Sequence, residues 1–338
     1  MRLARIGFMS ALLTFGATTA LPAAAQDFHD KTIRINVGSP PGTGYDTFAR
    51  LVSRNLGRFL PGNPNVVVNN MPGASGVNSV NYLYNLAPKD GTFIGLFDSA
   101  MPFYEAIGAL GIRYKSADLS WIGSLTRGVN IISVWHTAGV TDIEGAKKRE
   151  IVLGAVTGGG IMSVYPAMVN AILGTKFKIV TGYEGSAAVD LALEKGEVEA
   201  RGILISSWRT GHPDWLKDRK VHPIVQIGFQ RDRELSDVPL LTELAQNDEQ
   251  ARMFRFVSGP MAYERPFAGP PGLPPAILDL YRKAFGAMQK DAAFIEDAKK
   301  GGVDLDPLSG EEIAKIAVEI VATPEATVKA VKAMAGLN

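Results

Sequence analysis

The sequence predicts an α/β protein with two domains, in which helices cover parallel sheets. Short β-branched runs alternate along the chain with segments of helical periodicity, and this alternation is typical of parallel sheets. The chain has 338 residues, more than one hydrophobic core usually holds, so two domains are expected. It has no cysteine, so each core must be stable without disulfides.

The first 25 residues have the pattern of a secretory signal peptide. Arg2 and Arg5 precede a mainly apolar stretch over residues 6–20, and Ala23-Ala24-Ala25 offers a cleavage site of small residues. A membrane anchor is the alternative, but this stretch is shorter than the roughly 20 residues of a spanning helix. A lipid anchor is excluded because no cysteine is present. We therefore expect export to the periplasm, with cleavage near Ala25.

The charge balance argues against nucleic acid and membrane surfaces as partners. Without Arg2 and Arg5, the chain has 33 Lys and Arg against 34 Asp and Glu, a formal net charge of −1. Proteins that bind phosphate backbones carry clustered positive charge, and this composition gives no sign of it. No segment after Ala25 is apolar for long enough to cross a bilayer, so we expect no stable membrane insertion.

The first part of the chain predicts two strand–loop–helix units. A strand over residues 32–37 is followed by a loop of prolines and glycines and by a helix over residues 45–60. In that helix the apolar residues recur at spacings of three and four. The second unit has a strand at residues 66–68 and a helix at residues 77–86, and a strand at residues 93–97 follows.

A second series of elements begins near residue 131. Strands are predicted at residues 131–135, 151–155, 176–180, 200–205 and 221–226. Two helices, at residues 164–173 and 187–195, have matching end signals. Ser163 and Ser186 lie where N-caps are expected, and Gly174 and Gly196 lie where C′ glycines are expected.

The tail of the chain predicts three helices. Pro274-Pro275 opens the first, and Thr323-Pro324 starts the last. Between them, Ser309 and Glu312 have the spacing of a capping box. No linker marks a domain boundary, as expected for a chain that crosses twice between two lobes.

Common catalytic templates are absent from the sequence. It contains no nucleophile elbow, no Walker loop, no zinc-protease helix and no cysteine nucleophile. Gly158-Gly159-Gly160 lacks the third spaced glycine of a dinucleotide fingerprint. None of the four histidines has metal-ligand spacing: His29, His136, His212 and His222. We therefore expect a protein that is not an enzyme, with no catalytic residue, metal or cofactor.

Three loops of one type each join the end of a predicted strand to the start of a helix. They span residues 39–44, 157–163 and 183–186. Open α/β sheets bind ligands at this edge, and glycine-rich loops before helix starts present backbone N–H groups that suit a carboxylate. Nearby hydroxyls can supplement those amides: Thr43, Thr157, Ser163 and Ser186. A single loop of this type is usually only a helix start, so the prediction depends on all three occurring in one chain.

Five motifs occur in order along the chain. They are Pro41-Gly42-Thr43-Gly44-Tyr45-Asp46 with Ala49-Arg50, Val67-Val68-Asn69-Asn70-Met71-Pro72-Gly73-Ala74-Ser75-Gly76, Pro88-Lys89-Asp90-Gly91-Thr92, Tyr183-Glu184-Gly185-Ser186 with Gly196-Glu197-Val198, and Asp237-Val238-Pro239-Leu240-Leu241-Thr242-Glu243. In these motifs the chain resembles the substrate-binding receptors of tripartite tricarboxylate transporters, the TctC or Bug family. The resemblance runs from about Lys31 to the end of the chain.

This resemblance implies a type II periplasmic-binding-protein fold, with two α/β lobes and a ligand cleft between them. Lobe 1 would be discontinuous, with residues 26–129 and 254–338, and lobe 2 would span residues 130–253. In the family, carboxylates are held largely by backbone amides and bridging waters. The implied partners are a small organic acid and the membrane subunits of a tripartite transporter.

The resemblance also implies ligand contacts at matching positions: Gly42, Thr43, Asp46, Thr157, Gly159, Ser163, Gly185 and Ser186. The chain departs from the family where Pro-Gly-Gly becomes Pro41-Gly42-Thr43, and where the usual Pro-Ala is replaced by Ser186-Ala187-Ala188. We therefore expect a divergent member whose ligand the sequence does not identify. Asp46 has an alternative explanation as a first-turn carboxylate favoured by the helix dipole.

Arg201 lies inside a predicted strand, where an unpaired charge is costly. Either it faces the cleft and binds a carboxylate, or it pairs with Glu197 or Glu199 on the surface. Arg127 is a weaker candidate. Three aromatic residues are candidate apolar walls: Tyr45, Phe97 and Tyr183.

The function expected from these observations is a periplasmic receptor that closes around an organic carboxylate and delivers it to a tripartite transporter. One alternative is a receptor for a signalling system, which would use the same cleft. The other is an enzyme on the same two-lobed frame, which would require a reactive group in the cleft.

Overall fold

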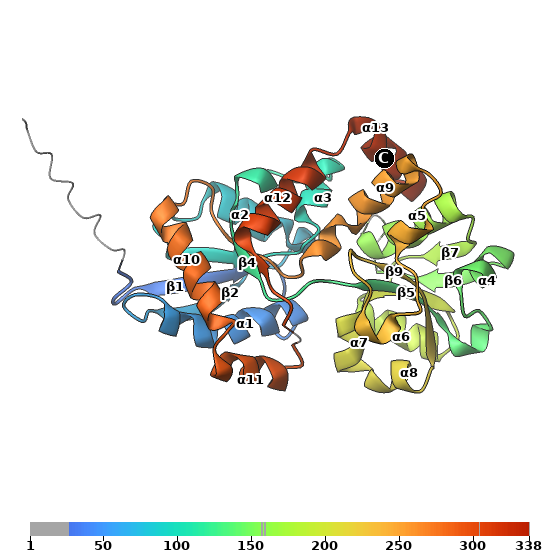
Figure 1. Cartoon of the computed structure of the whole chain (residues 1–338), viewed down its shortest axis with the longest axis horizontal. Helices are drawn as coiled ribbons and strands as arrows, with labels where there is room; N and C mark the ends of the chain where they lie inside the picture. Colours follow the sequence, from blue (N-terminus) through green and yellow to red (C-terminus); the bar gives the residue numbers. More distant parts are fainter. Residues whose placement is uncertain (1–26, 157, 159, 304, 338) are drawn as a thin grey trace, which may run out of the picture.

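The computed structural model describes residues 27–156, 158, 160–303 and 305–337. The predicted signal peptide, Thr157 and Gly159 lie outside the described residues. Figure 1 shows two α/β bodies side by side, joined near the middle of the molecule by extended segments. We call the body that contains the first strand lobe 1, and the other lobe 2. Among these residues, no helix combines the length and apolar character that crossing a membrane requires.

The described part of lobe 1 contains a six-stranded sheet. Its spatial order is β11 (Leu308–Ser309), β4 (Ser120–Ser124), β10 (Phe267–Gly269), β3 (Phe93–Leu96), β1 (Thr32–Val37) and β2 (Asn65–Asn70). β1 pairs in parallel with β2 and β3, and Thr32 lies opposite Asn65. β10 runs antiparallel to both of its neighbours, β3 and β4.

Helices cover both faces of this sheet. One face carries α1 (Gly44–Leu56), α10 (Pro275–Met288) and α11 (Ala292–Lys300), and the other carries α2 (Val77–Asn85), α3 (Met101–Ala106) and α12 (Gly310–Val321). In α1 the apolar positions predicted from spacing are buried: Phe48, Leu51, Val52 and Leu56. The hydrophobic effect thus places α1 on the sheet and leaves its first turn at the carboxyl ends of the strands.

Lobe 2 contains a five-stranded sheet among the described residues. Its order is β7 (Phe177–Val180), β6 (Ile151–Gly154), β8 (Ala200–Leu204), β5 (Asn130–Trp135) and β9 (Val221–Ile227). α4 (Ile143–Lys148), α5 (Ile161–Leu173) and α9 (Asp248–Ser258) pack on one face. The other face holds α6 (Ser186–Glu194), α7 (Ile205–Gly211) and α8 (Pro213–Lys217), with a core of three tryptophans: Trp135, Trp208 and Trp215.

The sheets are mixed, although the sequence predicted parallel sheets. β5 runs antiparallel to β8 and β9, and β10 runs antiparallel to β3 and β4. Both strands are the first that the chain forms after it passes from one lobe to the other. They enter their sheets from the edge that faces the other lobe. The parallel strands end at that edge, so the entering strand has the opposite direction.

Two connecting segments lie side by side between the lobes. Residues 125–129 lead from β4 to β5, and residues 259–266 lead from α9 to β10. The amide of Glu264 donates to the carbonyl of Thr126 at 2.8 Å, and the amide of Gly128 donates to the carbonyl of Met261 at 3.1 Å. Backbone hydrogen bonds therefore couple the two segments.

The carboxyl-terminal helix returns to lobe 2. α13 (Glu325–Ala335) packs against α5 and α9, and its residues Val328 and Val331 belong to the lobe 2 core (Figure 1). This differs from the predicted boundaries, which assigned residues 254–338 to lobe 1. The segment after α12, residues 322–324, is short, and its sequence gave no sign of a third passage between the lobes.

Most predicted helix ends are confirmed, and two caps are wrong. Gly174 ends α5 in the left-handed conformation, and Ser309 with Glu312 forms the capping box of α12. Ser163, however, lies within α5, which begins after Gly160, and its hydroxyl donates to the Gly160 carbonyl at 2.9 Å. Ser186 is the first residue of α6, and its hydroxyl accepts from Arg201 at 2.8 Å.

Candidate functional site

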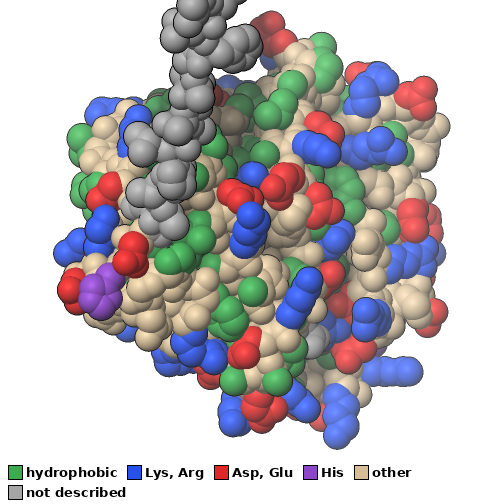
Figure 2. All heavy atoms as spheres, turned by 60° about the vertical axis from the view of Figure 1, so that its left-hand side comes forward, with side chains coloured by type: hydrophobic (Ala, Val, Ile, Leu, Met, Phe, Trp, Pro, Cys, Tyr) green, Lys and Arg blue, Asp and Glu red, His purple; other side chains and the backbone are tan. Residues whose placement is uncertain are grey.

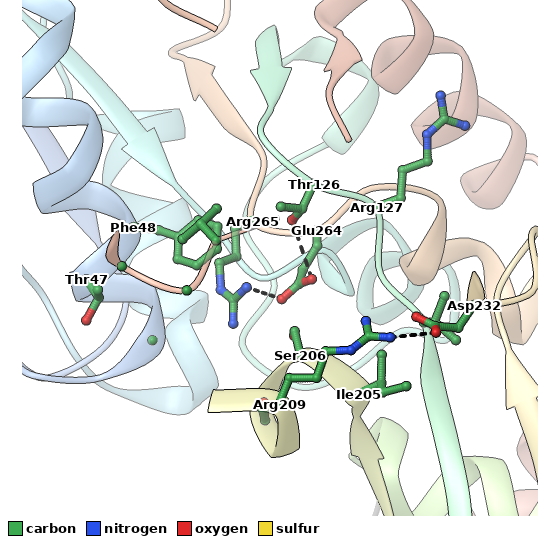
Figure 3. Close-up of a pocket in the computed structure, with 16 residues that line it drawn as sticks. Thr47, Phe48, Thr126, Arg127, Ile205, Ser206, Arg209, Asp232, Glu264 and Arg265 are labelled. Carbon is green, nitrogen blue, oxygen red and sulfur yellow. Dashed lines mark hydrogen bonds and ion pairs between the residues drawn. The ribbon is translucent and has the colours of Figure 1, made fainter. Parts of the chain in front are cut away.

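A pocket of about 410 Å³ lies between the lobes, beside the connecting segments (Figure 3). We call it the interlobe pocket. Lobe 1 contributes the start of α1 and residues 301–303, and lobe 2 contributes the start of α7 and Asp232. The connecting segments supply four polar side chains: Thr126, Arg127, Glu264 and Arg265.

A second pocket, of about 430 Å³, lies on lobe 1 at the carboxyl ends of β1, β2 and β3. We call it the loop pocket. Its lining is mainly apolar and glycine-rich, and it includes the predicted wall residues Tyr45 and Phe97. Asp98 is its one ionisable carboxylate. Burial raises the pKa of Asp98, and a hydrogen bond from the Ala100 amide opposes that rise.

The loop between β1 and α1 is held by its own hydrogen bonds. Thr43 caps α1, and its hydroxyl donates to the Pro40 carbonyl at 2.9 Å. Gly42 has φ +81°, a left-handed conformation that favours glycine, and its amide donates to the Asp46 carboxylate at 2.8 Å. The predicted ligand groups Gly42 and Thr43 therefore already have partners within the loop.

Asp46 is a structural anchor in this loop. It is 2% exposed and accepts hydrogen bonds from the Gly42 amide, from Arg50 Nε at 2.8 Å and from Asn70 Nδ2 at 2.9 Å. The Arg50 hydrogen bond is the largest cause that holds the pKa of Asp46 at about 2. These contacts support the alternative that Asp46 stabilises the first turn of α1.

The first two amides of α1 remain available at the pockets. Within the described part of the chain, no acceptor takes a hydrogen bond from the amides of Gly44 and Tyr45. Gly44 lines the interlobe pocket, and Tyr45 lines the loop pocket. The unsatisfied N–H groups of a helix start, with the positive end of its dipole, favour an anion.

Arg265 and Glu264 form a buried ion pair at the interlobe pocket, which the sequence analysis missed. The Arg265 guanidinium lies 4.1 Å from the ring centroid of Phe48. Burial raises the pKa of the Glu264 carboxyl, and the Arg265 charge opposes the rise. The available signal was a pair of adjacent charges inside an apolar segment, residues 259–269.

Two further arginines line the interlobe pocket. Arg209 of α7 binds Asp232 at 2.6 Å and Glu234 at 2.8 Å. Arg127 lies 3.4 Å from Asp306, and in Figure 3 its side chain is directed away from Arg209 and Arg265. The pocket therefore has two arginines that approach its interior, Arg209 from lobe 2 and Arg265 from a connecting segment.

In lobe 2, Arg201 pairs with a residue that was not predicted. It is 4% exposed and forms an ion pair with Asp190 of α6, while Glu199 pairs with Arg149. Arg201 also donates to the carbonyl and hydroxyl of Ser186, at 3.0 and 2.8 Å. Of the two alternatives for Arg201, the pairing with Glu197 or Glu199 is wrong, because α6 places the Asp190 carboxylate directly beside the strand.

The predicted ligand residues that the structure describes do not line either pocket. Gly42 and Thr43 fall between pocket-lining Pro40 and Gly44, but none of the seven described candidates is in either lining. Ligand contact by these seven residues stays a prediction: Gly42, Thr43, Asp46, Ser163, Gly185, Ser186 and Arg201. Thr157 and Gly159 lie outside the described residues. The described residues contain no cluster of His, Cys, Asp and Glu suited to a metal.

The outer surface carries no strong field of one sign on the face seen in Figure 2. Basic and acidic side chains are interspersed there. This agrees with the nearly balanced composition of the chain. The local groups beside the pockets that can attract an anion are the α1 amides and the buried Arg265.

Comparisons with known proteins give matches in structure alone. No family model matches the chain, and no curated protein matches it. A TctC solute-binding protein from Polaromonas superposes with a TM-score of 0.70 at 20% identity, over 90% of this chain and 98% of that one. An R. palustris protein solved with adipate gives 0.64 at 20% identity, over 92% and 99%. MatC from Rhodopseudomonas palustris, with bound malate, gives 0.62 at 17% identity, over 88% and 98%.

These matches confirm the fold that the sequence motifs implied. They cover both lobes and nearly the full length of each relative. The order of the strands, the two antiparallel entry strands and the paired connecting segments are thus parts of one known architecture. The chain has the two-lobed α/β fold of periplasmic binding proteins, in the form seen in TctC-type solute-binding proteins.

Proposed function

We propose that this protein is a periplasmic receptor, a divergent member of the TctC or Bug family, that captures a small organic carboxylate between its lobes. The observation that carries the proposal is the start of α1, where Gly44 at the interlobe pocket and Tyr45 at the loop pocket have amides without an acceptor in the described part of the chain. Amides at a helix start bind a carboxylate without a compensating charge. The solved relatives with bound adipate and malate support this ligand class.

Lobe closure is the proposed mechanism of capture. The connecting segments at residues 125–129 and 259–266 are the hinge, because they lead from one sheet region to the other beside the pocket and are hydrogen-bonded to each other. Closure brings the start of α6, with Gly185 and Ser186, toward the ligand held at α1. Ligand binding then stabilises the closed state by its contacts with both lobes.

Export and delivery complete the proposed function. The signal peptide at residues 1–25 directs the chain to the periplasm, where no cofactor is required for binding. The closed receptor then docks on the membrane subunits of a tripartite tricarboxylate-type transporter and releases the solute to them. No catalytic group is assigned to the cleft.

Thermal unfolding in the presence of organic acids tests the proposal. A ligand that binds only the folded state at 100 times its Kd adds about 2.7 kcal/mol to the free energy of unfolding. We expect such stabilisation by at least one small dicarboxylate or hydroxyacid, and none by the matching uncharged amides. If no carboxylate raises the melting temperature, or if the protein consumes the acid, the receptor function is contradicted.

A further inference from the structure

We infer that Arg265 is a specificity-determining residue, whose guanidinium binds a second anionic group of the ligand at the hinge-side end of the cleft. This inference rests on the proposed function and deepens it. The α1 amides hold one carboxylate, and Arg265 selects solutes that carry another. Four observations support this role: the fixed position of the side chain, its unused donors, its neighbours and its backbone.

The guanidinium of Arg265 is held in place before any ligand arrives. It lies 4.1 Å from the ring centroid of Phe48 and 5.5 Å from that of Tyr45, and Arg265 is 8% exposed. Stacking on two aromatic faces leaves the planar group few alternative orientations. Binding an anion therefore costs little additional side-chain entropy.

Arg265 has more donors than partners. One terminal nitrogen pairs with Glu264, and Nε has no hydrogen-bond partner among the described residues. The other terminal nitrogen, Nη2, lies 3.3 Å from the position that a Cβ on Gly44 would occupy. The absence of a side chain at Gly44 thus lets Nη2 approach the first turn of α1 at the edge of the pocket.

The two positive features converge at this corner. The amides of Gly44 and Tyr45 have no acceptor in the described part of the chain, and the Arg265 guanidinium lies beside them. Figure 3 shows Arg265 next to Phe48 above the start of α7, with Arg209 on the facing wall. Arg209 already binds both Asp232 and Glu234, whereas Arg265 shares one carboxylate. Of these two arginines, Arg265 is therefore the one with free donors.

The backbone at Arg265 is in an uncommon conformation. Its φ of +52° is in the left-handed region, which residues with a side chain rarely adopt. Such strain persists where the surrounding structure imposes it, and it is concentrated at ligand sites and hinges. At Arg265 the strained residue is part of the connecting segment itself. A ligand bound by Arg265 therefore contacts the segment that moves during closure.

The test compares dicarboxylates with monocarboxylates of the same chain length. Titration calorimetry measures Kd for succinate, glutarate and adipate, and for butyrate, pentanoate and hexanoate. The proteins are the wild type, Arg265→Gln, Arg265→Lys and Glu264→Gln. Arg231→Gln is the control, because Arg231 forms an exposed ion pair with Glu243 on lobe 2. Thermal melts verify that each variant is folded.

We expect Arg265→Gln to weaken binding of the preferred dicarboxylate by at least about tenfold, the loss of one charge-assisted hydrogen bond. The Kd for the monocarboxylate of the same chain length should change by less than about threefold. Arg265→Lys should weaken dicarboxylate binding by an intermediate amount, because lysine keeps the charge but not the planar guanidinium. Glu264→Gln should tighten dicarboxylate binding, because it removes the carboxylate that competes with the ligand for Arg265. If the ion pair were purely structural, Glu264→Gln would weaken binding as Arg265→Gln does.

The outcomes separate the inference from the function on which it rests. If the wild type binds none of the six acids and no carboxylate or hydroxyacid raises its melting temperature, the proposed function itself is contradicted. If the wild type binds a dicarboxylate and both Arg265 variants bind it equally well, the inference alone is wrong. A Glu264→Gln variant that weakens dicarboxylate binding as much as Arg265→Gln would also overturn it, even if Arg265→Gln does not fold.

Discussion

Two buried arginines of the described chain, Arg201 in lobe 2 and Arg265 in a connecting segment, each pair with a carboxylate, and the two pairs differ in how completely they are bonded. In lobe 2, Arg201 binds Asp190 and both oxygens of Ser186, and Asp190 also accepts from Trp208 Nε1 at 3.2 Å. At the hinge, Arg265 has Glu264 as its ion-pair partner and an Nε without one.

This difference teaches that burial of an arginine does not by itself indicate a ligand site. Arg201 was a candidate ligand residue because it interrupts an apolar strand in the sequence. In the structure its hydrogen bonds connect β8 to the first turn of α6. Arg265 directly follows another charged residue, Glu264, and was not among the predicted candidates. The arginine with unused donors is the one beside a pocket, and the arginine with complete bonding is part of the framework.

Loss of Arg201 should have the largest effect on stability. Arg201→Met leaves the Asp190 charge buried without its partner, and we expect a loss of about 3 to 5 kcal/mol in the free energy of unfolding. Urea denaturation measures it. The double variant Arg201→Met with Asp190→Leu should recover most of that loss, because no charge then remains buried. If the single variant lost less than the double variant, the framework role would be wrong.

Loss of Arg265 should cost less stability, about 2 to 3 kcal/mol near neutral pH, because Glu264 can take up a proton. Burial already raises the pKa of Glu264, and removal of the guanidinium raises it further. A raised carboxyl pKa stabilises the folded state at low pH, and that stability is lost as the pH rises through the folded pKa. The cost of Arg265→Gln in urea should therefore grow from pH 5 to pH 8, whereas a constant cost would contradict the assignment.

Asp46, like Arg201, is a buried charged residue whose hydrogen bonds are all made within its own lobe. Its pKa is lowered from 3.8 to about 2, so its stabilisation is present above pH 3.8 and disappears as the pH falls toward 2. Asp46→Asn should cost about 2 kcal/mol at pH 7. Denaturation curves at decreasing pH should show the variant and the wild type converge. A difference that stayed unchanged at pH 3 would show that the charge is not the cause.

Gly44→Ala should have the smallest effect on stability, within about 0.5 kcal/mol. Alanine suits a helix, but its Cβ would lie 3.3 Å from Arg265 Nη2, so the guanidinium must shift by a few tenths of an ångström. We expect a few-fold weaker affinity for dicarboxylates with an unchanged melting temperature. Gly286→Ala on α10, where an added Cβ meets nothing within 4 Å, is the matched control.

Local signals in the sequence predicted the elements well. The Thr32–Val37 strand has the expected bounds, and the Ser309–Glu312 capping box is present. Apolar spacing identified the buried face of α1, although the helix ends at Leu56 and a short 3₁₀ turn follows. These features depend on neighbours within a few residues, so the sequence contains their cause.

The caps at Ser163 and Ser186 show the limit of that approach. Both residues lie near helix starts as predicted, but Ser186 Oγ accepts from Arg201, 15 residues away in the chain. A hydroxyl binds whichever donor the fold places nearest. The sequence specifies the hydroxyl, and the neighbouring strand specifies its partner.

By itself, the sequence determined the alternation of strands and helices, the glycine-rich loops at the sheet edge and the motifs that resemble those of solute-binding receptors. Only the tertiary structure decided which charges face a pocket and which are bonded internally. Arg201 and Asp190 are 11 residues apart, while the interlobe pocket combines residues from α1, α7 and both connecting segments. Burial and pairing depend on such distant neighbours, and these set whether an arginine stabilises the fold or has donors left for a ligand.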